Sequence, residues 1–329
     1  MQAVRIYEYG DPSVMKLEDA PTLVPGAGEV LVRVEAASVN FLDIVQRRGD
    51  TAKQNFYNQN GLGGEFPITL GSQGVGIVEQ LGEGVSNVKV GERVAFGGQG
   101  TYATHFIANA ARVIPVPAAL TLEQAAGGLI QGFVAYQLTN LAYPIKPGEW
   151  ALIHAAAGGV GLLAVQMAKL RGGKVIGVTS SEDKAQAVRA AGADEIIIST
   201  RSDIAKEARR ITGGKGVSVV YDGVGKDTFE ASLDSLAPRG YLVIFGQSSG
   251  YIPPFDLMLL QEKGSLFITR TNAGFYFEDF PAYLRDLVTW VQAGKLQIKA
   301  DRTFPLAQVA QAHALVEGRQ STGRVLLIP

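Results

Sequence analysis

The sequence predicts an α/β protein with two domains, a β-barrel and a doubly wound parallel sheet. The chain has 329 residues, which is enough for two domains of ordinary size. Its first third contains short segments rich in Val, Ile and aromatic residues, bounded by Gly and Pro. From about residue 122 onward, apolar segments alternate with helical ones, which is typical of a parallel sheet covered by helices on both faces.

The first domain is expected to be a compact barrel or sandwich. The predicted strands are "AVRIYEY" (3–9), "EVLVRVEAASV" (29–39), "GVGIVEQLG" (74–82), "GERVAF" (91–96) and "TYATHFIA" (101–108). Between them, the polar stretch from Gly49 to Pro67 predicts a long loop, and loops of this length are usually functional.

The second domain is expected to contain six parallel strands, the full complement of a dinucleotide-binding sheet. The strands are "WALIHA" (150–155), "KVIGVT" (174–179), "EIIIS" (195–199), "VSVVYD" (217–222), "YLVIFG" (241–246) and "SLFITR" (265–270). Helices at 280–294 and 306–318 and a closing strand at 323–329 follow, with no seventh strand–helix unit. We therefore predict one domain from residues 1–122 and 269–329 and another from residues 123–268.

Composition and charge argue against several classes of protein. Thirty basic and 31 acidic residues give a net charge of −1, which does not favour nucleic-acid binding. No apolar run approaches the roughly 20 residues that span a bilayer, and no signal segment precedes the first strand, so we expect a cytoplasmic protein without membrane contact. The chain has no Cys, which excludes disulfides and thiolate metal ligands.

The stretch "HAAAGGVG" (154–161) indicates a phosphate cradle. The dinucleotide template G-x-G-x-x-G falls on Ala156, Gly158 and Gly161, with Ala in the first place. The expected context is present, because a strand precedes the stretch and a helix and further strand–helix units follow. In such a Rossmann domain the glycines allow a tight turn, and the helix N-terminus binds the pyrophosphate. A plain small-residue turn is the alternative.

The end of the second strand of this sheet indicates which dinucleotide is bound. NAD-specific sites place an acidic residue there, about 20 residues after the glycines. Here the strand ends in the neutral residues Thr179, Ser180 and Ser181; the acidic residues Glu182 and Asp183 come just after, and Lys184 follows. Hydroxyl groups and a lysine suit a 2′-phosphate, which favours NADPH. Alternatively, Ser181 caps the next helix, with the two acidic residues in its first turn, and both interpretations can hold together.

The sequence argues against a zinc site and a nucleophile. A zinc dehydrogenase site needs Cys and His ligands, and this chain has only His105, His154 and His313, which are widely spaced. We expect these histidines to be structural. Because no nucleophile motif is present either, the chemistry is expected to be hydride transfer to an acceptor that needs little acid–base help. Quinones fit best, and alkenes conjugated to a carbonyl come next.

The β-rich first domain, "AAAGGVG", "VVYDGVG", "FGQSSG" and the terminal "LLIP" together resemble the zinc-free, ζ-crystallin-like quinone oxidoreductases of the medium-chain dehydrogenase/reductase superfamily. The resemblance covers nearly the whole chain. It implies a GroES-like catalytic domain from both chain ends, a central NADPH domain, a catalytic cleft between them and a homodimer. Zinc enzymes of the superfamily carry a Gly-His-Glu element where this chain reads "GSQG" (71–74).

The resemblance also implies roles for individual residues. "SVNFLD" matches the family's "INxxD" element, so Asn40 is expected at the nicotinamide, although it could simply cap the following helix. Tyr57 is the candidate replacement for a tyrosine that the family has after this helix. Val134 stands where relatives have a threonine, and Arg201 is near Ser199, which replaces a tyrosine beside the 2′-phosphate. The expected cofactor-binding residues are Asn40, Gln131, Ala156, Gly158, Gly159, Val160, Gly161, Thr179, Ser180, Lys184, Ser199, Gly223, Val224, Phe245, Gly246, Ser248, Thr269 and Arg324.

The predicted function is therefore an NADPH-dependent, zinc-independent quinone oxidoreductase. One alternative is an NADPH-dependent reductase of enones or alkenals. Another, from a different class, is a low-turnover NADPH-binding protein of the crystallin or RNA-binding kind. Arg324 is expected to reach the cofactor phosphates, unless it is an ordinary surface charge. The strand from Ser265 to Arg270 is expected to pair with its copy in a homodimer.

Overall fold

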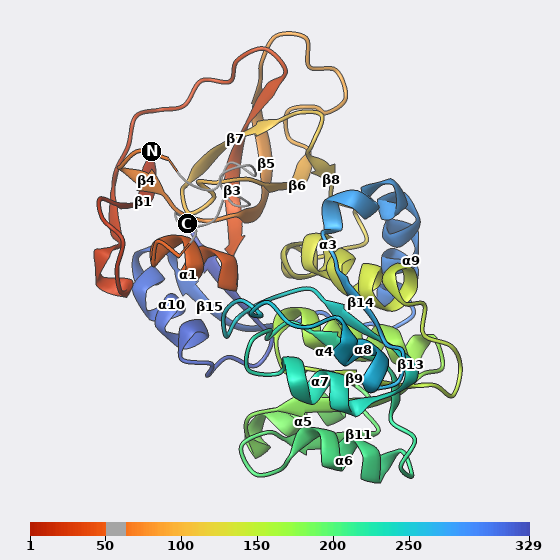
Figure 1. Ribbon diagram of the computed structural model, residues 1–329. Helices are drawn as coiled ribbons and strands as arrows, with labels where there is room; N and C mark the ends of the chain where they lie inside the picture. Colours follow the sequence, from red (N-terminus) through yellow and green to blue (C-terminus); the bar gives the residue numbers. More distant parts are fainter. Residues whose placement is uncertain (51–63) are drawn as a thin grey trace. The chain divides into compact units, whose positions relative to one another are not determined.

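The computed structural model describes residues 1–50 and 64–329. The chain forms two compact units: unit 1 contains residues 1–130 and 299–329, and unit 2 contains residues 131–298. Figure 1 shows both chain ends in unit 1. Because the long loop falls largely within residues 51–63, Tyr57 lies outside the described residues.

Unit 1 is built on two sheets whose strands come from both ends of the chain. A three-stranded sheet has the order β2-β1-β4, and a seven-stranded sheet has the order β15-β16-β3-β5-β6-β8, with β7 also paired to β3. The strands are β1 (Gln2–Ile6), β2 (Lys16–Asp19), β3 (Glu29–Ser38), β4 (Ile68–Thr69), β5 (Gln73–Leu81), β6 (Arg93–Gly97), β7 (His105–Asn109), β8 (Ile114–Pro115), β15 (Ala300–Pro305) and β16 (Arg324–Ile328).

Helices pack against these sheets and close the core of unit 1. They are η1 (Pro12–Val14), α1 (Phe41–Arg47), η4 (Leu306–Gln308) and α10 (Val309–Glu317), and α3 (Leu122–Tyr136) begins in this unit. The core is apolar and joins residues of β3, β5, α10 and β16, including Val32, Val78, Leu315 and Leu327. The C-terminal strand and helix therefore complete a core begun by the first hundred residues.

Unit 2 contains six parallel strands in the order β11-β10-β9-β12-β13-β14. This is the dinucleotide-binding order. The elements are η2 (Gln137–Ala142), β9 (Trp150–Ile153), α4 (Gly159–Leu170), β10 (Lys174–Thr179), α5 (Glu182–Ala190), β11 (Glu195–Ile198), α6 (Ile204–Ile211), β12 (Val217–Asp222), α7 (Phe229–Ser235), β13 (Leu236–Ile244), α8 (Met258–Glu262), β14 (Phe267–Arg270), η3 (Ala273–Asp279) and α9 (Phe280–Gln292). The α/β fold class with a Rossmann sheet is confirmed.

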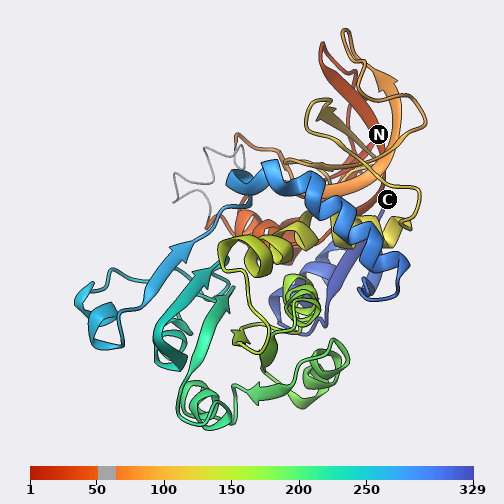
Figure 2. The same cartoon turned by 90° about the vertical axis from the view of Figure 1, so that its right-hand side faces the viewer.

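The boundaries of the units differ from those expected from the sequence. The sequence predicts a second domain of residues 123–268, but residues 123–130 belong to unit 1 and residues 269–298, which include α9, belong to unit 2. The physical reason is aromatic packing: Phe133 of α3 contacts Phe280 and Tyr283 of α9, with ring centroids 5.1 and 5.6 Å apart. Figure 2 shows α9 lying beside α3. Only the segment from residue 299 onward returns to unit 1.

Candidate active site

The turn between β9 and α4 has the close backbone approach of a phosphate cradle. A Cβ atom on Gly161 would lie 2.4 Å from the Ala155 carbonyl oxygen and 2.8 Å from the Ala156 backbone, which no side chain tolerates. Gly158 is the N-cap of α4, and a Cβ there would meet only the Ala155 oxygen, at 3.2 Å. The first backbone N–H groups of a helix have no partner within the helix, so they are available to an anion.

The end of β10 supplies hydroxyl groups and a lysine beside this cradle. The Thr179 hydroxyl is buried and has no hydrogen-bond partner, which is the state of a group that a polar ligand or water would satisfy. Ser180 and Lys184 are half-buried next to it. The side chain of Ser181 accepts from the Lys184 backbone N–H, so the helix-cap interpretation of Ser181 is correct.

The loop after β11 lies beside the end of β10. The Ser199 hydroxyl donates to the Thr179 carbonyl oxygen at 3.3 Å, and the Thr200 hydroxyl donates to the Ser180 oxygen at 3.0 Å. Arg201 is exposed in the same loop. Polar and basic groups from two neighbouring strands therefore meet at this corner of the sheet.

A buried aspartate that the sequence analysis did not assign shapes the next turn. Asp222 ends β12, and its Oδ1 accepts the backbone N–H groups of Val224 (2.7 Å) and Gly225 (3.0 Å). Its Oδ2 accepts from the hydroxyl of Ser232 at 2.8 Å, and that hydroxyl oxygen lies 3.0 Å from Nε2 of His154. Burial lowers the pKa of His154. The signal in the sequence was the Asp-Gly pair in "VVYDGVG", which is typical of a turn held by its own aspartate.

The ends of β12 and β13 pack against each other through glycine. A Cβ on Gly246 would lie 2.5 Å from the Gly223 oxygen, and a Cβ on Gly223 would lie 2.7 Å from the Phe245 ring. The Ser248 N–H donates to the Gly223 oxygen at 3.2 Å. One strand further, Thr269 of β14 pairs with Val243. Most predicted cofactor residues of unit 2 thus follow the carboxyl ends of β9 to β13, where open α/β sheets bind their ligands. Gln131, by contrast, lies in α3.

In unit 1, Asn40 is the N-cap of α1, and its amide is held in one orientation. The amide Nδ2 donates to Ser72 Oγ at 3.1 Å and to Gln73 Oε1 at 3.4 Å. Gln73 is itself fixed, because its Nε2 donates to the Ala126 oxygen at 3.1 Å. The sequence analysis noted Ser72 and Gln73 only as replacements for a metal-binding element. The structure shows that both hold the Asn40 amide.

A chain of buried polar groups leads from Asn40 into the interior of unit 1. The Asn40 backbone N–H and the Tyr102 hydroxyl both donate to Asp43 Oδ2 at 2.8 Å. His313 Nε2 lies 3.2 Å from the Tyr102 oxygen, and its Nδ1 lies 3.4 Å from Arg47. An arginine can only donate, so His313 is neutral with its proton on Nε2, and the hydrogen bonds run from Arg47 towards Asp43. Burial and the Arg47 charge lower the pKa of His313 to about 3.

The histidines have structural partners, as expected. His154 and His313 are buried, and His105 Nε2 lies 3.2 Å from Glu79.

Arg324 is 5% exposed in β16, so it is not an ordinary surface charge. Among residues 1–50 and 64–329, no group of three or more His, Cys, Asp or Glu side chains could hold a metal ion. Every helix in this part of the chain is too short or too polar to cross a membrane.

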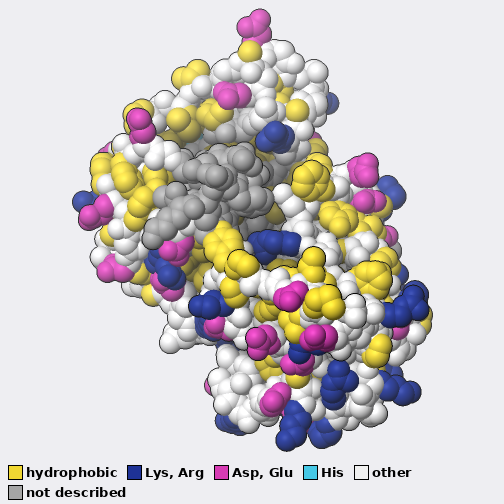
Figure 3. Space-filling model, in the orientation of Figure 1, with side chains coloured by type: hydrophobic (Ala, Val, Ile, Leu, Met, Phe, Trp, Pro, Cys, Tyr) yellow, Lys and Arg dark blue, Asp and Glu magenta, His cyan; other side chains and the backbone are white. Residues whose placement is uncertain are grey.

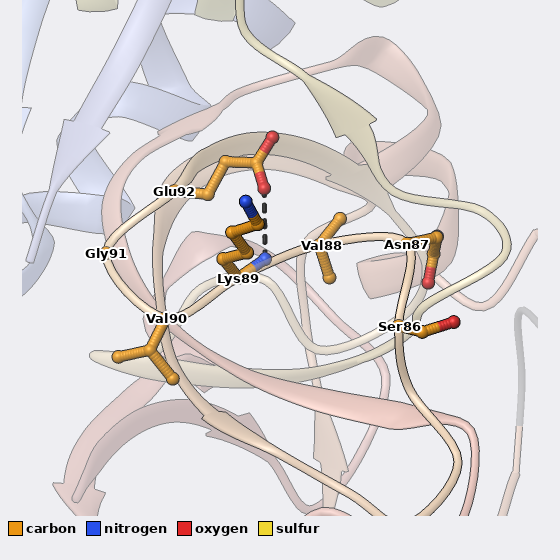
Figure 4. A pocket seen from close by; sticks show the side chains of 7 residues that line it. All are labelled: Ser86, Asn87, Val88, Lys89, Val90, Gly91 and Glu92. Atoms are coloured by element: carbon orange, nitrogen blue, oxygen red, sulfur yellow. Dashed lines mark hydrogen bonds between the residues drawn. The ribbon is translucent and has the colours of Figure 1, made fainter.

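A surface hollow lies away from these residues, in the loop between β5 and β6. It is lined by residues 86–92. The Lys89 backbone N–H donates to the Glu92 carboxylate at 3.0 Å across it (Figure 4). The hollow lies beyond the C-terminal end of β5, whereas the site residue Gln73 lies at the N-terminal end of the same strand. It contains none of the predicted site residues.

Comparison with known proteins identifies two families and several close relatives. Residues 26–118 match the family described as "Alcohol dehydrogenase GroES-like domain", and residues 159–289 match "Zinc-binding dehydrogenase". The chain is 39% identical to a quinone oxidoreductase of Pseudomonas aeruginosa over 331 residues, covering 99% of each protein. It is 38% identical to a 2-haloacrylate reductase of Burkholderia sp, covering 100% of this chain and 99% of the relative.

A solved structure agrees with this result. The crystal structure of Escherichia coli quinone oxidoreductase complexed with NADPH superposes with a TM-score of 0.93 at 36% identity, covering 100% of both chains.

Proposed function

Because the chain belongs to the quinone oxidoreductases of the medium-chain dehydrogenase/reductase superfamily, we propose that it catalyses the NADPH-dependent reduction of a quinone. The observation that carries the proposal is the corner of unit 2 where the glycine turn meets the neutral end of β10. Gly161 admits no side chain, the Thr179 hydroxyl is buried without a partner, and no acidic side chain stands at positions 179–181.

The residues at this corner fit NADPH. The N-terminus of α4, with Gly158, would hold the pyrophosphate, and Ser180 and Lys184 would hold the 2′-phosphate. The bound cofactor would supply a hydride, which is two electrons and one proton. An aspartate or glutamate at the end of β10 would instead select the 2′-hydroxyl of NADH.

In unit 1, we propose Asn40 as the residue that touches the reacting end of the cofactor or the acceptor. Its Nδ2 group already donates to Ser72 and Gln73, so the amide cannot rotate without breaking two hydrogen bonds. This fixed orientation suits a residue that must present a polar group at a constant position. Tyr57 remains a candidate from the sequence, as does Arg324 as a phosphate ligand.

The test is cofactor oxidation with 1,4-benzoquinone, followed at the nicotinamide absorbance with NADPH and NADH in parallel. The proposal predicts quinone-dependent oxidation that strongly prefers NADPH. Equal rates with both cofactors would contradict the assignment of Ser180 and Lys184, and failure to oxidise either would contradict the activity.

Reduction of an activated alkene is the second candidate, and a specific observation favours it. The 2-haloacrylate reductase matches this chain with nearly the same identity as the quinone oxidoreductase, 38% against 39%. A panel of quinones and of enones at equal concentration separates the two functions. We expect the quinones to have the higher kcat/KM; the reverse order would establish the alkene reductase.

We further propose a cytoplasmic homodimer in which β14 pairs with its copy. In unit 2, β14 is an edge strand that pairs with β13, and Phe267 on it is 45% exposed. Figure 3 shows hydrophobic side chains gathered on the face of unit 2 that is turned to the viewer, and the exposed apolar residues of this unit include Tyr251, Leu257 and Met258. An edge strand of this kind tends to pair with another chain. Light scattering should give a dimer for the wild type and a monomer for Ile268→Lys; a monomeric wild type would refute the assembly.

A further inference from the structure

A titratable carboxyl group, that of Asp43, lies buried against the backbone N–H of Asn40. Asp43 is fully buried. The Asn40 backbone N–H and the Tyr102 hydroxyl both donate to the same oxygen of its carboxyl group, Oδ2. The other oxygen, Oδ1, is buried and has no hydrogen-bond partner. An ionised Asp43 would therefore carry negative charge on an oxygen that nothing stabilises. Burial raises the pKa of Asp43 to about 6, so both protonation states are accessible near neutral pH.

The charged groups near Asp43 do not compensate its charge directly. Arg47, one turn along α1, directs its guanidinium to the Gly10 oxygen, to His313 and to Glu317, which it meets at 2.7 Å. His313 of α10 is neutral and donates towards Tyr102. Tyr102 keeps its proton, because burial and the neighbouring Asp43 charge raise its pKa well above the ordinary value. Asp43 is thus the group in this chain of hydrogen bonds that exchanges a proton most readily.

Ser72 connects Asp43 to the outside of unit 1. Its hydroxyl shares a hydrogen bond with the Asp43 carboxyl and accepts the Asn40 Nδ2 group at 3.1 Å. Ser72 is half-buried, whereas Asp43 is inaccessible. A proton that leaves Asp43 on this side therefore passes through the Ser72 hydroxyl, beside the amide of Asn40.

We propose that Asp43 and Ser72 form a proton relay that protonates the acceptor oxygen, an inference that rests on the proposed quinone reduction. The quinone receives a hydride, which leaves a hydroquinone anion that still needs one proton. The Ser72 O–H bond breaks as its proton moves to that oxygen, and the Asp43 proton moves to Ser72. Asp43 is left ionised and takes a proton from water before the next turnover. Ser72 and Asp43 also hydrogen-bond to Asn40, so the same two residues would orient Asn40 and supply the proton to the quinone oxygen.

The relay predicts a specific pH dependence of kcat. Only the protonated form of Asp43 can donate, so wild-type kcat should fall about tenfold per pH unit above its pKa. Ser72→Ala should lower kcat about 100-fold at pH 5.5 and remove this pH dependence, so that the two proteins converge near pH 8. Ser72→Thr keeps a hydroxyl and should restore most of the rate. Ser235→Ala is the matched control, because Ser235 is a buried serine of α7 whose hydroxyl donates to the Ala231 oxygen, away from this cluster.

A measurement without cofactor tests the same cluster independently of activity. Carbon-13 NMR of aspartate carboxyl groups should show one aspartate titrating near pH 6, and Asp43→Asn should remove that signal. Because the Ser72 hydrogen bond lowers the pKa of Asp43, Ser72→Ala should move the signal to higher pH, while Ser235→Ala should leave it in place.

The outcomes separate the relay from the function on which it rests. A wild type that reduces no quinone would overturn both. Normal quinone reduction with an unchanged pH profile in Ser72→Ala, or no rescue by Ser72→Thr, would overturn the relay alone.

Discussion

The turn between β9 and α4 gives the sharpest prediction, because substituting two of its glycines should have different effects. Gly161→Ala should mainly lower stability, and Gly158→Ala should mainly lower NADPH affinity. In Gly161→Ala the new Cβ would lie 2.4 Å from the Ala155 oxygen and 2.8 Å from the Ala156 backbone. Alanine is favoured over glycine inside a helix by about 1 kcal/mol, but forcing backbone apart costs about 1–3 kcal/mol. Since both contacts are with backbone that cannot rotate away, we expect the upper end of this cost, and therefore a net loss of about 2 kcal/mol in the free energy of unfolding.

Gly158→Ala is the matched comparison. Its Cβ would meet only the Ala155 oxygen, at 3.2 Å, and it occupies the cap position of α4, so we expect a stability loss below about 1 kcal/mol. The pyrophosphate, however, must approach the backbone there, so NADPH affinity should fall at least about tenfold, or about 1.4 kcal/mol. Urea unfolding and NADPH fluorescence titration measure the two effects. A Gly161→Ala protein as stable as wild type, or a Gly158→Ala protein with wild-type affinity, would refute the reasoning.

Three further predictions follow from the site. Lys184→Ala should raise the KM for NADPH about tenfold or more and leave the KM for NADH unchanged, since a charged hydrogen bond to phosphate contributes about 1.5–3 kcal/mol; steady-state kinetics with both cofactors checks this, and an equal effect on both would contradict the 2′-phosphate assignment. The raised pKa of Asp43 stabilises the fold below pH 3.8, and this stabilisation is lost as pH rises past about 6. The difference in unfolding free energy between wild type and Asp43→Asn should therefore fall by about 2 kcal/mol from pH 4 to 7; a difference independent of pH would show that Asp43 has an ordinary pKa. Prolonged dialysis against a chelator should leave quinone reduction unchanged, because the chain has no Cys and its histidines have structural partners; loss of activity that zinc restores would contradict this.

The sheet of unit 2 was predictable because its strands contain short apolar segments that alternate with helical ones, although β13 begins at Leu236, ahead of the predicted segment 241–246. The strand ends then placed the glycines, Ser180 and Lys184 at one edge, since parallel strands share their direction. The extent of unit 2 was not predictable, because α9 joins it through ring contacts with Phe133 that no local pattern encodes. Helical periodicity shows that a helix has an apolar face, but not which surface covers it.

The polar cluster of unit 1 could not be predicted from the sequence, because its members are far apart along the chain. Asp43 is separated from Tyr102 by 59 residues and Tyr102 from His313 by 211. In the sequence, Asp43 stood out only as the last residue of the "SVNFLD" element, and Ser72 and Gln73 only as positions where zinc enzymes have a metal-binding element. The pairing of β3 with β5 and the packing of α10 against α1 bring most of these side chains together, and the Tyr102 backbone is held by hydrogen bonds to Val4 and Leu70. Sequence reasoning identified Asn40 and missed the groups that hold it.

The central claim is that this protein is a catalyst that transfers a hydride from NADPH to a quinone. The most direct test is a single turnover: protein loaded with one equivalent of NADPH is mixed with excess 1,4-benzoquinone in a stopped-flow instrument. We expect the nicotinamide absorbance to be lost in one rapid phase, with one hydroquinone formed per NADPH, and this phase to be slower when the transferred hydrogen is deuterium. Bound NADPH whose absorbance persists in the presence of quinone would contradict the account and leave a nucleotide-binding protein without this activity.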